Sequence, residues 1–463
     1  MDEQALCYTD IATLGRLYRT RVISPTEATR AVFDRIRRLD QRLNSFITVL
    51  EQPALEQARR AEAELDSGHD RGPLHGVPIS LKDLIDTAGT RTTAASRLWR
   101  DRVPTTSATV ARRLEQAGAI LIGKCNLLEF AYGIVHPDYG PCNNPWDLQR
   151  TSGGSSSGSA ASVAAGMGWG SIGTDTGGSI RIPAAYCGVV GLKPTYGRVS
   201  LHGICPLSAS LDHAGPLART VADAAVLFAA LAGHDPLDPH SLADAADDDA
   251  ARMTDDVRGL RVGVVAEHMG ADLQAGVAEA TWAAVHVLEQ AGMQVREIHI
   301  LSLHAADEAL LAAIMPEATL VHADWLRDHP ADYAALTRAQ LEQGAQISAV
   351  DYLRAQAYRR QLRVDMLDAL GDVDVLISPT VAWEAPVEDP PVGEGQGATE
   401  ARRSGPYNLT GLPAISAPCG FGSQGLPLGL QIAAAPLAEQ LLLRVAHTYE
   451  QRAGWFQQRP LFF

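Results

Sequence analysis

The chain reads TSGGSSSGSAAS over residues 151–162 and GTDTGGSIRIP over residues 173–183, so two Gly-Gly-Ser elements stand 24 positions apart. Glycine lets the backbone pass close to a ligand, and a Gly-Gly-Ser turn that opens a helix presents several N–H groups at its positive end. Gly/Ser tracts are usually flexible linkers. Here apolar residues run between and after the tracts, over 160–172 and 180–190. We therefore interpret the tracts as turns embedded in a core and suited to an oxyanion.

Helices and strands are expected to alternate on both sides of these tracts. Ser24-Pro25-Thr26-Glu27 has the pattern of a helix start, with a serine cap, proline at the first helical position and glutamate three residues after the cap. The apolar residues 76–81 are typical of a strand, which would end at Lys82. Further expected elements are helices from about Pro53 and over 107–117 and 271–291, and strands over 119–123, 260–265, 293–300 and 373–378. This alternation predicts a layered α/β fold in which helices cover a sheet.

One acidic segment, residues 235–256, is rich in Asp, Ala and Pro. It is either a linker between a catalytic first half and a second half, or a surface excursion of one continuous domain. Strands are expected on both sides of it, which favours the excursion. We therefore expect a single domain over residues 1–463, with the catalytic core at about 70–215.

Composition and charge argue against several classes of protein. The 463 residues are 46% hydrophobic and 20% charged, as in ordinary globular proteins, and the net charge of −15 argues against a nucleic acid partner. The acidic start Met1–Gln4 leads into no apolar run, so we expect no secretory signal, no membrane partner and a cytoplasmic location. The six cysteines form no CxxC pair and no histidines cluster with them, so no metal site is expected.

Lysine is rare in this chain, since only Lys82, Lys124 and Lys193 occur among 39 basic residues. Lysine differs from arginine in that it can lose its proton inside a protein. All three lysines fall in the stretch that holds the glycine-rich tracts. Lys82 is the candidate base, and we assign Lys124 and Lys193 to structure.

Two other kinds of site compete for the glycine-rich tracts. Neither tract matches the phosphate-binding patterns G-x-x-x-x-G-K-[ST] or G-x-G-x-x-G. A Ser-His-Asp hydrolase is the second competitor, and the nearby imidazole with an adjacent acid is that of Asp212-His213. We interpret Asp212 and His213 as loop residues with local hydrogen bonds.

The chain resembles the amidase signature family over nearly its whole length. The resemblance rests on VPISLKD at 77–83, GGSS at 153–156 and GTDTGGSIR at 173–181, in this order. Further matches are Asn144-Pro145-Trp146, Cys187-Gly188 and GLKPTYGR at 191–198. The resemblance implies a central mixed β-sheet of many strands flanked by α-helices, and a hydrolase without a metal or organic cofactor.

The resemblance also implies a Ser-Ser-Lys catalytic triad. Ser179 is the implied nucleophile, Ser155 the bridging serine in an unusual cis peptide, and Lys82 the base. A serine needs a neighbouring base, and lysine can act as one only when neutral. Lowering its pKa from about 10.4 to near 7 costs roughly 4 to 5 kcal/mol, which burial can supply. Ser157, where many relatives have glycine, removes none of these three groups.

The loop around the nucleophile is expected to bind the oxyanion. The backbone N–H groups expected to bind it are those of Thr176, Gly177, Gly178 and Ser179. The residues expected to hold this loop in shape are Ser156, Thr174, Asp175 and Arg181. For Asp175 and Arg181, a structural ion pair and a direct catalytic role are equally supported by the sequence.

The resemblance leaves two substrate classes open. A free-standing amidase would act on aryl amides, anilides, carbamates or urea-like compounds. The A subunit of the tRNA-dependent amidotransferase would hydrolyse glutamine. In the amidotransferase an arginine and an aspartate hold glutamine; here Arg359 matches the arginine, but Ala401 stands at the aspartate position, followed by Arg402 and Arg403. We therefore expect a free-standing amidase whose small-molecule amide carries an acidic or polar group near Arg402 or Arg403. The other residues expected to line the substrate pocket are Tyr132, Gly133, Ile134 and Tyr139.

Two further alternatives concern partners and activity. The sequence leaves a homodimer open. An inactive scaffold with the same fold is disfavoured, because a scaffold has no use for a desolvated lysine beside Ser155 and Ser179.

Overall fold

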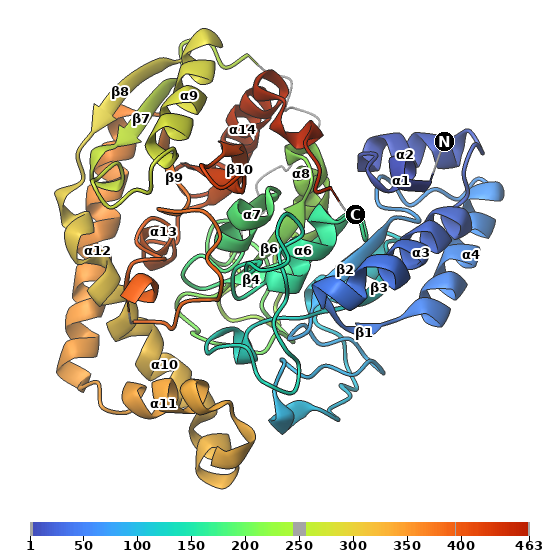
Figure 1. Ribbon diagram of the computed structural model, residues 1–463, viewed down its shortest axis with the longest axis horizontal. Coiled ribbons are helices and arrows are strands. Elements are labelled where there is room, and N and C mark those ends of the chain that lie inside the picture. Colours follow the sequence, from blue (N-terminus) through green and yellow to red (C-terminus); the bar gives the residue numbers. More distant parts are fainter. Residues whose placement is uncertain (1–2, 244–255, 394, 462–463) are drawn as a thin grey trace.

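The computed structural model describes residues 3–243, 256–393 and 395–461, and within these residues eleven strands form one sheet (Figure 1). In spatial order the strands are β1 (Phe46–Val49), β3 (Ile120–Cys125), β2 (Pro78–Lys82), β4 (Gly170–Asp175), β6 (His213–Ala218), β5 (Val190–Lys193), β10 (Ala414–Phe421), β11 (Pro427–Ala433), β9 (Val375–Pro379), β7 (Arg261–Val265) and β8 (Gln294–Ile298). The pair β2–β4 is parallel and the pair β4–β6 is antiparallel. The expected mixed sheet of many strands is therefore confirmed.

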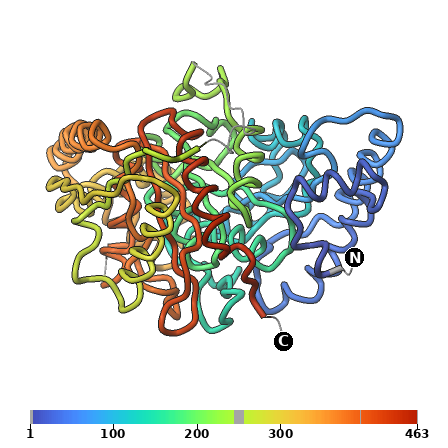
Figure 2. Tube along the Cα trace, turned by 90° about the horizontal axis from the view of Figure 1, so that it is seen from above, coloured from blue at the N-terminus to red at the C-terminus, as the bar shows by residue number. Residues whose placement is uncertain are grey.

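Helices flank this sheet. They are α1 (Glu3–Cys7), α2 (Ile11–Arg19), α3 (Pro25–Leu43), α4 (Glu51–Asp66), α5 (Thr109–Gln116), α6 (Ser157–Ala164), α7 (Arg181–Cys187), α8 (Val221–Leu231), α9 (Val277–Gln290), α10 (Ala306–Asp328), α11 (Ala335–Gly344), α12 (Ala349–Asp372), α13 (Gly405–Leu409) and α14 (Glu439–Ala453). Figures 1 and 2 both place α1 to α4 at one end of the molecule and α10 to α12 at the other. No helix among the described residues is long and apolar enough to cross a membrane.

Most of the expected elements are present within a few residues of their expected ends. The Ser24 side chain and Glu27 form a capping box at the start of α3, and β2 ends at Lys82. The helix expected from residue 271 instead begins at Val277, because Gly276 adopts φ = 92°, a left-handed conformation that cannot be part of a right-handed helix. The acidic segment 235–256 falls mainly on residues 244–255, which lie outside the described residues.

The centre of the sheet positions the glycine-rich tracts. Strands β2, β4, β5 and β6 are buried along their whole length. Because β2 and β4 are parallel neighbours, their C-terminal residues Lys82 and Asp175 lie at the same edge of the sheet. The two tracts lead directly into α6 and α7, so both Gly-Gly-Ser turns open a helix as expected.

Candidate active site

Lys82 is fully buried at the end of β2 and contacts two hydroxyl groups. Its Nζ lies 2.8 Å from Ser155 Oγ and 2.9 Å from Thr174 Oγ1. Burial lowers the pKa of Lys82 from 10.5 to about 7, although the negative charges of Asp175 and Asp212 act in the opposite direction. A lysine in this state is neutral for a large part of the time near neutral pH and can accept a proton.

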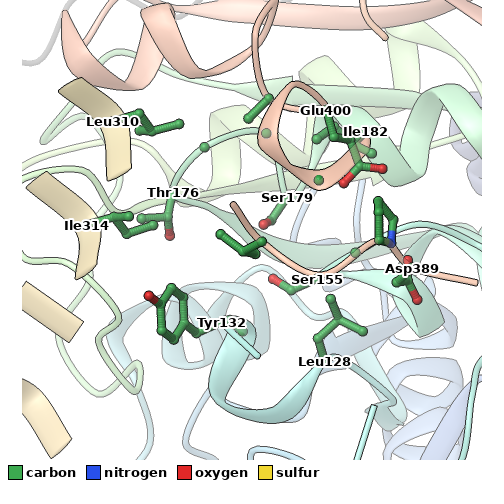
Figure 3. A pocket seen from close by; sticks show the side chains of 18 of the residues that line it. Leu128, Tyr132, Ser155, Thr176, Ser179, Ile182, Leu310, Ile314, Asp389 and Glu400 are labelled. Atoms are coloured by element: carbon green, nitrogen blue, oxygen red, sulfur yellow. The ribbon is translucent and has the colours of Figure 1, made fainter. Parts of the chain in front are cut away.

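Ser155 and Ser179 lie at the starts of the two helices that follow the glycine-rich tracts. The Gly154–Ser155 peptide bond is cis, and the Ser155 side chain is buried. The two turns are joined by a hydrogen bond from the Ser156 N–H to the Ser179 carbonyl at 3.2 Å. Figure 3 shows the hydroxyl groups of Ser155 and Ser179 facing each other in one pocket. The structure thus brings all three residues expected in the triad together.

The loop from Thr176 to Ser179 offers free N–H groups to this pocket. The N–H groups of Ile180 and Arg181 donate to Asp175 Oδ2, at 3.1 and 3.4 Å. Those of the four preceding residues have no acceptor among the described residues, and all four residues line the pocket. Such inward-facing donors suit a developing negative charge on oxygen.

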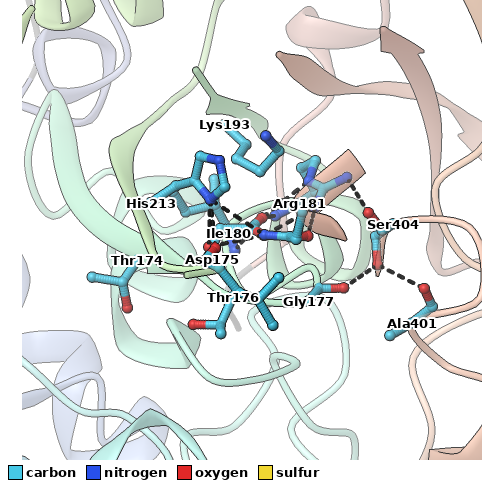
Figure 4. A network of polar contacts seen from close by, with 12 residues as sticks. Thr174, Asp175, Thr176, Gly177, Ile180, Arg181, Lys193, His213, Ala401 and Ser404 are labelled. Carbon is cyan, nitrogen blue, oxygen red and sulfur yellow. Dashed lines mark hydrogen bonds and ion pairs between the residues drawn. The ribbon is translucent and has the colours of Figure 1, made fainter. Parts of the chain in front are cut away.

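A buried polar network holds this loop from behind (Figure 4). Arg181 forms a two-pronged contact with Asp175, with Nη2 to Oδ1 at 2.9 Å and Nε to Oδ2 at 3.0 Å. Asn408 Nδ2 donates to Asp175 Oδ1 at 2.8 Å, and Ser404 Oγ donates to the Gly177 carbonyl at 2.6 Å. Burial alone would raise the pKa of Asp175, but the charge and hydrogen bonds of Arg181 outweigh burial and hold it well below 3.8.

Neither Asp175 nor Arg181 lines the pocket, so their positions favour the structural ion pair over a direct catalytic role. Ser156 belongs to the same supporting layer, because its Oγ donates to the Thr174 carbonyl at 3.1 Å. Thr174 differs from these residues in that its own hydroxyl contacts Lys82.

Asp212 also supports the loop from Thr176 to Ser179, through a contact that no sequence pattern indicated. Its Oδ1 accepts a hydrogen bond from Thr176 Oγ1 at 2.6 Å. His213 is the first residue of β6, not a loop residue as expected, and its Nδ1 lies 2.7 Å from the Leu211 carbonyl. Burial lowers the pKa of His213 well below 6.5, and His213 does not line the pocket. The expected local hydrogen bonds are present, and the imidazole is placed away from the two serines.

The other two lysines are buried in different surroundings. Lys124 Nζ lies 3.3 Å from Asp83 Oδ1 and donates to the Ile85 carbonyl. Lys193 Nζ donates to the Leu412 carbonyl at 2.5 Å. Neither lysine contacts a serine hydroxyl among the described residues, which fits their assignment to structure.

The pocket around Ser179 is lined by apolar and acidic residues, and Figure 3 shows Ile182 beside Glu400 and Leu128 near Asp389. Its apolar lining consists of Leu128, Ala131, Tyr132, Ile182, Leu207, Leu310, Leu311, Ile314, Val392, Ala398 and Ala401, and its acidic lining consists of Asp307, Asp389 and Glu400. Apart from Ala401, the residues from α10 and from the segment after β9 were not found from the sequence. They carry no motif and reach the pocket only through the fold.

Of the residues expected to bind substrate near the pocket entrance, Tyr132 alone lines it in the described chain. Gly133 packs against Thr337, so tightly that a Cβ there would lie 1.9 Å from Thr337 Oγ1. Ile134 lines a separate cavity beside Cys142, and the Tyr139 hydroxyl donates to the Ser96 carbonyl at 3.1 Å.

The two arginines expected near the substrate are held by other groups. Arg359 donates to Ser210 Oγ at 2.7 Å and to the Leu409 carbonyl at 3.1 Å. Arg402 Nε donates to Asp307 Oδ2 at 2.8 Å. Neither arginine lines the pocket, whereas Ala401 does.

The comparisons with known proteins agree on one protein family. A family model described as Amidase matches residues 27–443. Two curated relatives are both named as the A subunit of glutamyl-tRNA(Gln) amidotransferase. The one from Marinomonas sp. (strain MWYL1) is 39% identical over 97% of this chain and 98% of its own length. The one from Moorella thermoacetica is 38% identical over 98% of this chain and 99% of its own length.

The similar solved structures agree with this family. A structure described as a vestigial protein complex that reveals the evolutionary origins of an s-triazine catabolic enzyme has a TM-score of 0.90, with 31% identity over 98% of this chain and 100% of its own. A crystal structure of an amidase has a TM-score of 0.86 and 35% identity over 96% and 100% of the two chains. The A subunit of the glutamyl-tRNA(Gln) amidotransferase from Thermotoga maritima has a TM-score of 0.79 and 31% identity over 92% and 91%.

Proposed function

Since this chain belongs to the amidase signature family, whose enzymes hydrolyse amide C–N bonds, we propose that it cleaves its substrate through an acyl-enzyme on Ser179, with Ser155 and Lys82 as the proton relay. The observation that carries this proposal is the 2.8 Å contact between Lys82 Nζ and Ser155 Oγ in a fully buried position. A neutral lysine there can take up a proton that a serine hydroxyl releases.

The proposed reaction begins when Ser179 Oγ attacks the carbonyl carbon of the amide. Its proton passes to Ser155 Oγ, which gives its own proton to Lys82. The carbonyl oxygen becomes negative and is held by N–H groups of the loop from Thr176, each worth about 3 to 4 kcal/mol in comparable sites. The C–N bond then breaks, and the departing nitrogen receives the proton that returns from Lys82 through Ser155. Water then attacks the acyl carbon and gives one proton through Ser155 to Lys82. The bond between that carbon and Ser179 Oγ breaks, and Ser179 Oγ takes the proton back through Ser155, which releases the carboxylic acid and restores the enzyme.

The relatives favour one substrate class over the other. The curated relatives described above are named as components of a glutamyl-tRNA(Gln) amidotransferase, which supports the glutamine-hydrolysing alternative better than the expected aryl amide or carbamate hydrolase. These names also contradict, in part, the expectation that the chain has no nucleic acid partner. As such a component, the chain would hydrolyse glutamine within a complex that acts on tRNA.

The pocket supports the free-standing amidase through a different observation. Arg359 is committed to Ser210 and a carbonyl, and Ala401 has no carboxylate to offer. The apolar wall of Leu310 and Ile314 fits an alkyl or aryl group instead. A hydrolase of apolar amides, anilides or carbamates is therefore the second candidate.

One experiment separates the two candidates. The purified chain is assayed for ammonia release from glutamine, alone and with the other subunits of an amidotransferase, and for release of amine from a panel of aryl amides, carbamates and peptide amides. Glutaminase activity that requires the other subunits supports the amidotransferase, and turnover of panel amides by the chain alone supports the amidase. Hydrolysis of none of these compounds, together with no labelling of Ser179 by a fluorophosphonate, contradicts the proposed chemistry.

A further inference from the structure

Two carboxyl groups enter the pocket on the side opposite its apolar wall. Figure 3 shows Asp389 and Glu400 on one side of the two serine hydroxyls and Leu310 and Ile314 on the other. Both acids belong to the segment between β9 and α13, and neither belongs to the glycine-rich tracts. The two serine hydroxyls thus lie between the apolar pair Leu310 and Ile314 and a region where the two acids lie with Ile182 and Leu128.

These two acids differ from the third acid of the pocket in their partners. Asp307 is paired with Arg402, at 2.8 Å. Glu400 Oε1 accepts a hydrogen bond from the Tyr186 hydroxyl at 2.9 Å, and Asp389 Oδ1 lies 3.7 Å from the position that a Cβ on Gly154 would occupy. Neither acid forms an ion pair with a basic residue of the described chain, and no described residue that lines the pocket is lysine or arginine.

Such an arrangement disfavours two negative charges. Burial raises the pKa of Asp389 to about 6, and burial together with the charge of Asp389 raises the pKa of Glu400 to about 8. Both side chains are half-buried, and a carboxylate that is shielded from water without a basic partner is destabilised, whereas a cation placed beside it offsets that cost. A positively charged ligand would therefore be bound with both acids ionised.

From the positions of these groups, we infer that Asp389 and Glu400 form a subsite for a protonated amine of the substrate. The substrate is then an amide with a cationic group on one side of the scissile bond and an apolar group, facing Leu310 and Ile314, on the other. This inference rests on the proposed function, because it takes the pocket beside Ser179 as the place where the amide binds.

The inference also bears on glutamine. Its ammonium group would find Glu400 in place of the carboxylate missing at Ala401. Its carboxylate group would meet no basic side chain among the described lining residues. An amide with an amine and no neighbouring carboxylate should therefore bind better than glutamine.

Binding to the Ser179→Ala variant tests the inference without relying on turnover. Calorimetry compares 6-aminohexanamide with heptanamide and with the monoamide of adipic acid, which differ in charge but little in size. A second series, N-(5-aminopentyl)acetamide against N-hexylacetamide, places the charge on the amine side. In at least one series the cationic ligand should bind about 10- to 100-fold more tightly than the neutral one, as expected for a charge-assisted hydrogen bond.

Matched variants assign the effect to the two acids. Glu400→Gln keeps the shape of the side chain and should bring the ratio of the affinities for the cationic and the neutral ligand close to one. Asp389→Asn should reduce the same ratio. Glu388→Gln makes the same change at an exposed neighbour and should leave the preference intact. Equal or tighter binding of the neutral ligands in both series, or a preference that survives Glu400→Gln, would overturn the inference. Failure of the wild-type chain to hydrolyse any amide would count against the proposed function only, since binding is measured without the nucleophile.

Discussion

The pH dependence of Ser179 reactivity offers the sharpest test of the relay. Burial places the pKa of Lys82 at about 7, so its neutral fraction is about 1% at pH 5 and about 90% at pH 8. If neutral Lys82 is the base, reaction of Ser179 with an uncharged fluorophosphonate should rise about 90-fold between these pH values, with a midpoint within about one unit of 7. The second-order rate constant of labelling, measured at several pH values, reports this change on the free enzyme.

Two variants connect that rise to one side chain. Lys82→Met keeps an unbranched side chain that is one atom shorter than lysine and cannot accept a proton, so labelling should be slower by several orders of magnitude and independent of pH. Glu400→Gln removes a neighbouring group with a raised pKa of about 8 and should keep the rise. A flat profile in the wild-type chain, or a Lys82→Met protein whose labelling still increases with pH, would refute the assignment of Lys82 as the base.

The remaining predictions concern the serines, the stability of the fold and the imidazole. Ser179→Ala should abolish turnover and labelling, whereas Ser155→Ala, which interrupts the path to Lys82, should lower kcat/KM by about 10²- to 10⁴-fold in an amide hydrolysis assay. Lys82→Met should raise the free energy of unfolding at pH 7 by about 3 kcal/mol in urea, because the 10.5-to-7 pKa shift costs about 5 kcal/mol and two lost hydrogen bonds return about 2. The gain should be complete below pH 7, since the unfolded lysine binds its proton first, and above pH 10.5 the variant should be the less stable protein by about 2 kcal/mol, because only the hydrogen-bond loss remains; a variant less stable than wild type at pH 7 would contradict it. Asp175→Asn should lower the free energy of unfolding by about 3 to 5 kcal/mol, because it leaves a buried guanidinium uncompensated, and an unchanged urea midpoint would exclude the ion pair as a main support. His213→Ala should keep most of kcat/KM, because the ring does not line the pocket, and a loss as large as that of Ser179→Ala would point to an imidazole mechanism.

The sequence predicted the parts of the site that lie close to a motif. A strand followed by Lys82, and two glycine-rich turns that open helices, are local features, and local patterns determine them. The rarity of lysine pointed to Lys82 before any contact was known. The mixed sheet followed from the resemblance and from the alternation of helices and strands.

The walls of the pocket could not be predicted in the same way. Leu310 and Ile314 occupy one face of a long helix, and nothing in their spacing distinguishes a residue that faces a pocket from one that faces the core. Asp389 and Glu400 belong to a segment without regular periodicity, where acids are usually solvated. Arg359 donates a hydrogen bond to Ser210, which is distant in the sequence, so this contact could be seen only in the folded structure.

The placement of His213 and the start of α9 show how small local errors arise. Asp212-His213 lies among polar residues, which suggested a loop, but pairing with Asp175 extends β6 to His213. The helix expected from residue 271 was delayed to Val277 because the glycine before it takes a left-handed conformation.

The pocket draws its two halves from unrelated parts of the chain. The reacting groups come from β2 and the two glycine-rich turns, and the surfaces that would meet the substrate come from α10 and the segment before α13. Arg181 ties the nucleophile turn to Ser404 and Asn408 through buried contacts, so the loop geometry is fixed independently of the side chains at 389 and 400. Substitutions at 389 and 400 are therefore expected to change which substrate binds while leaving the proposed bond-breaking groups in place.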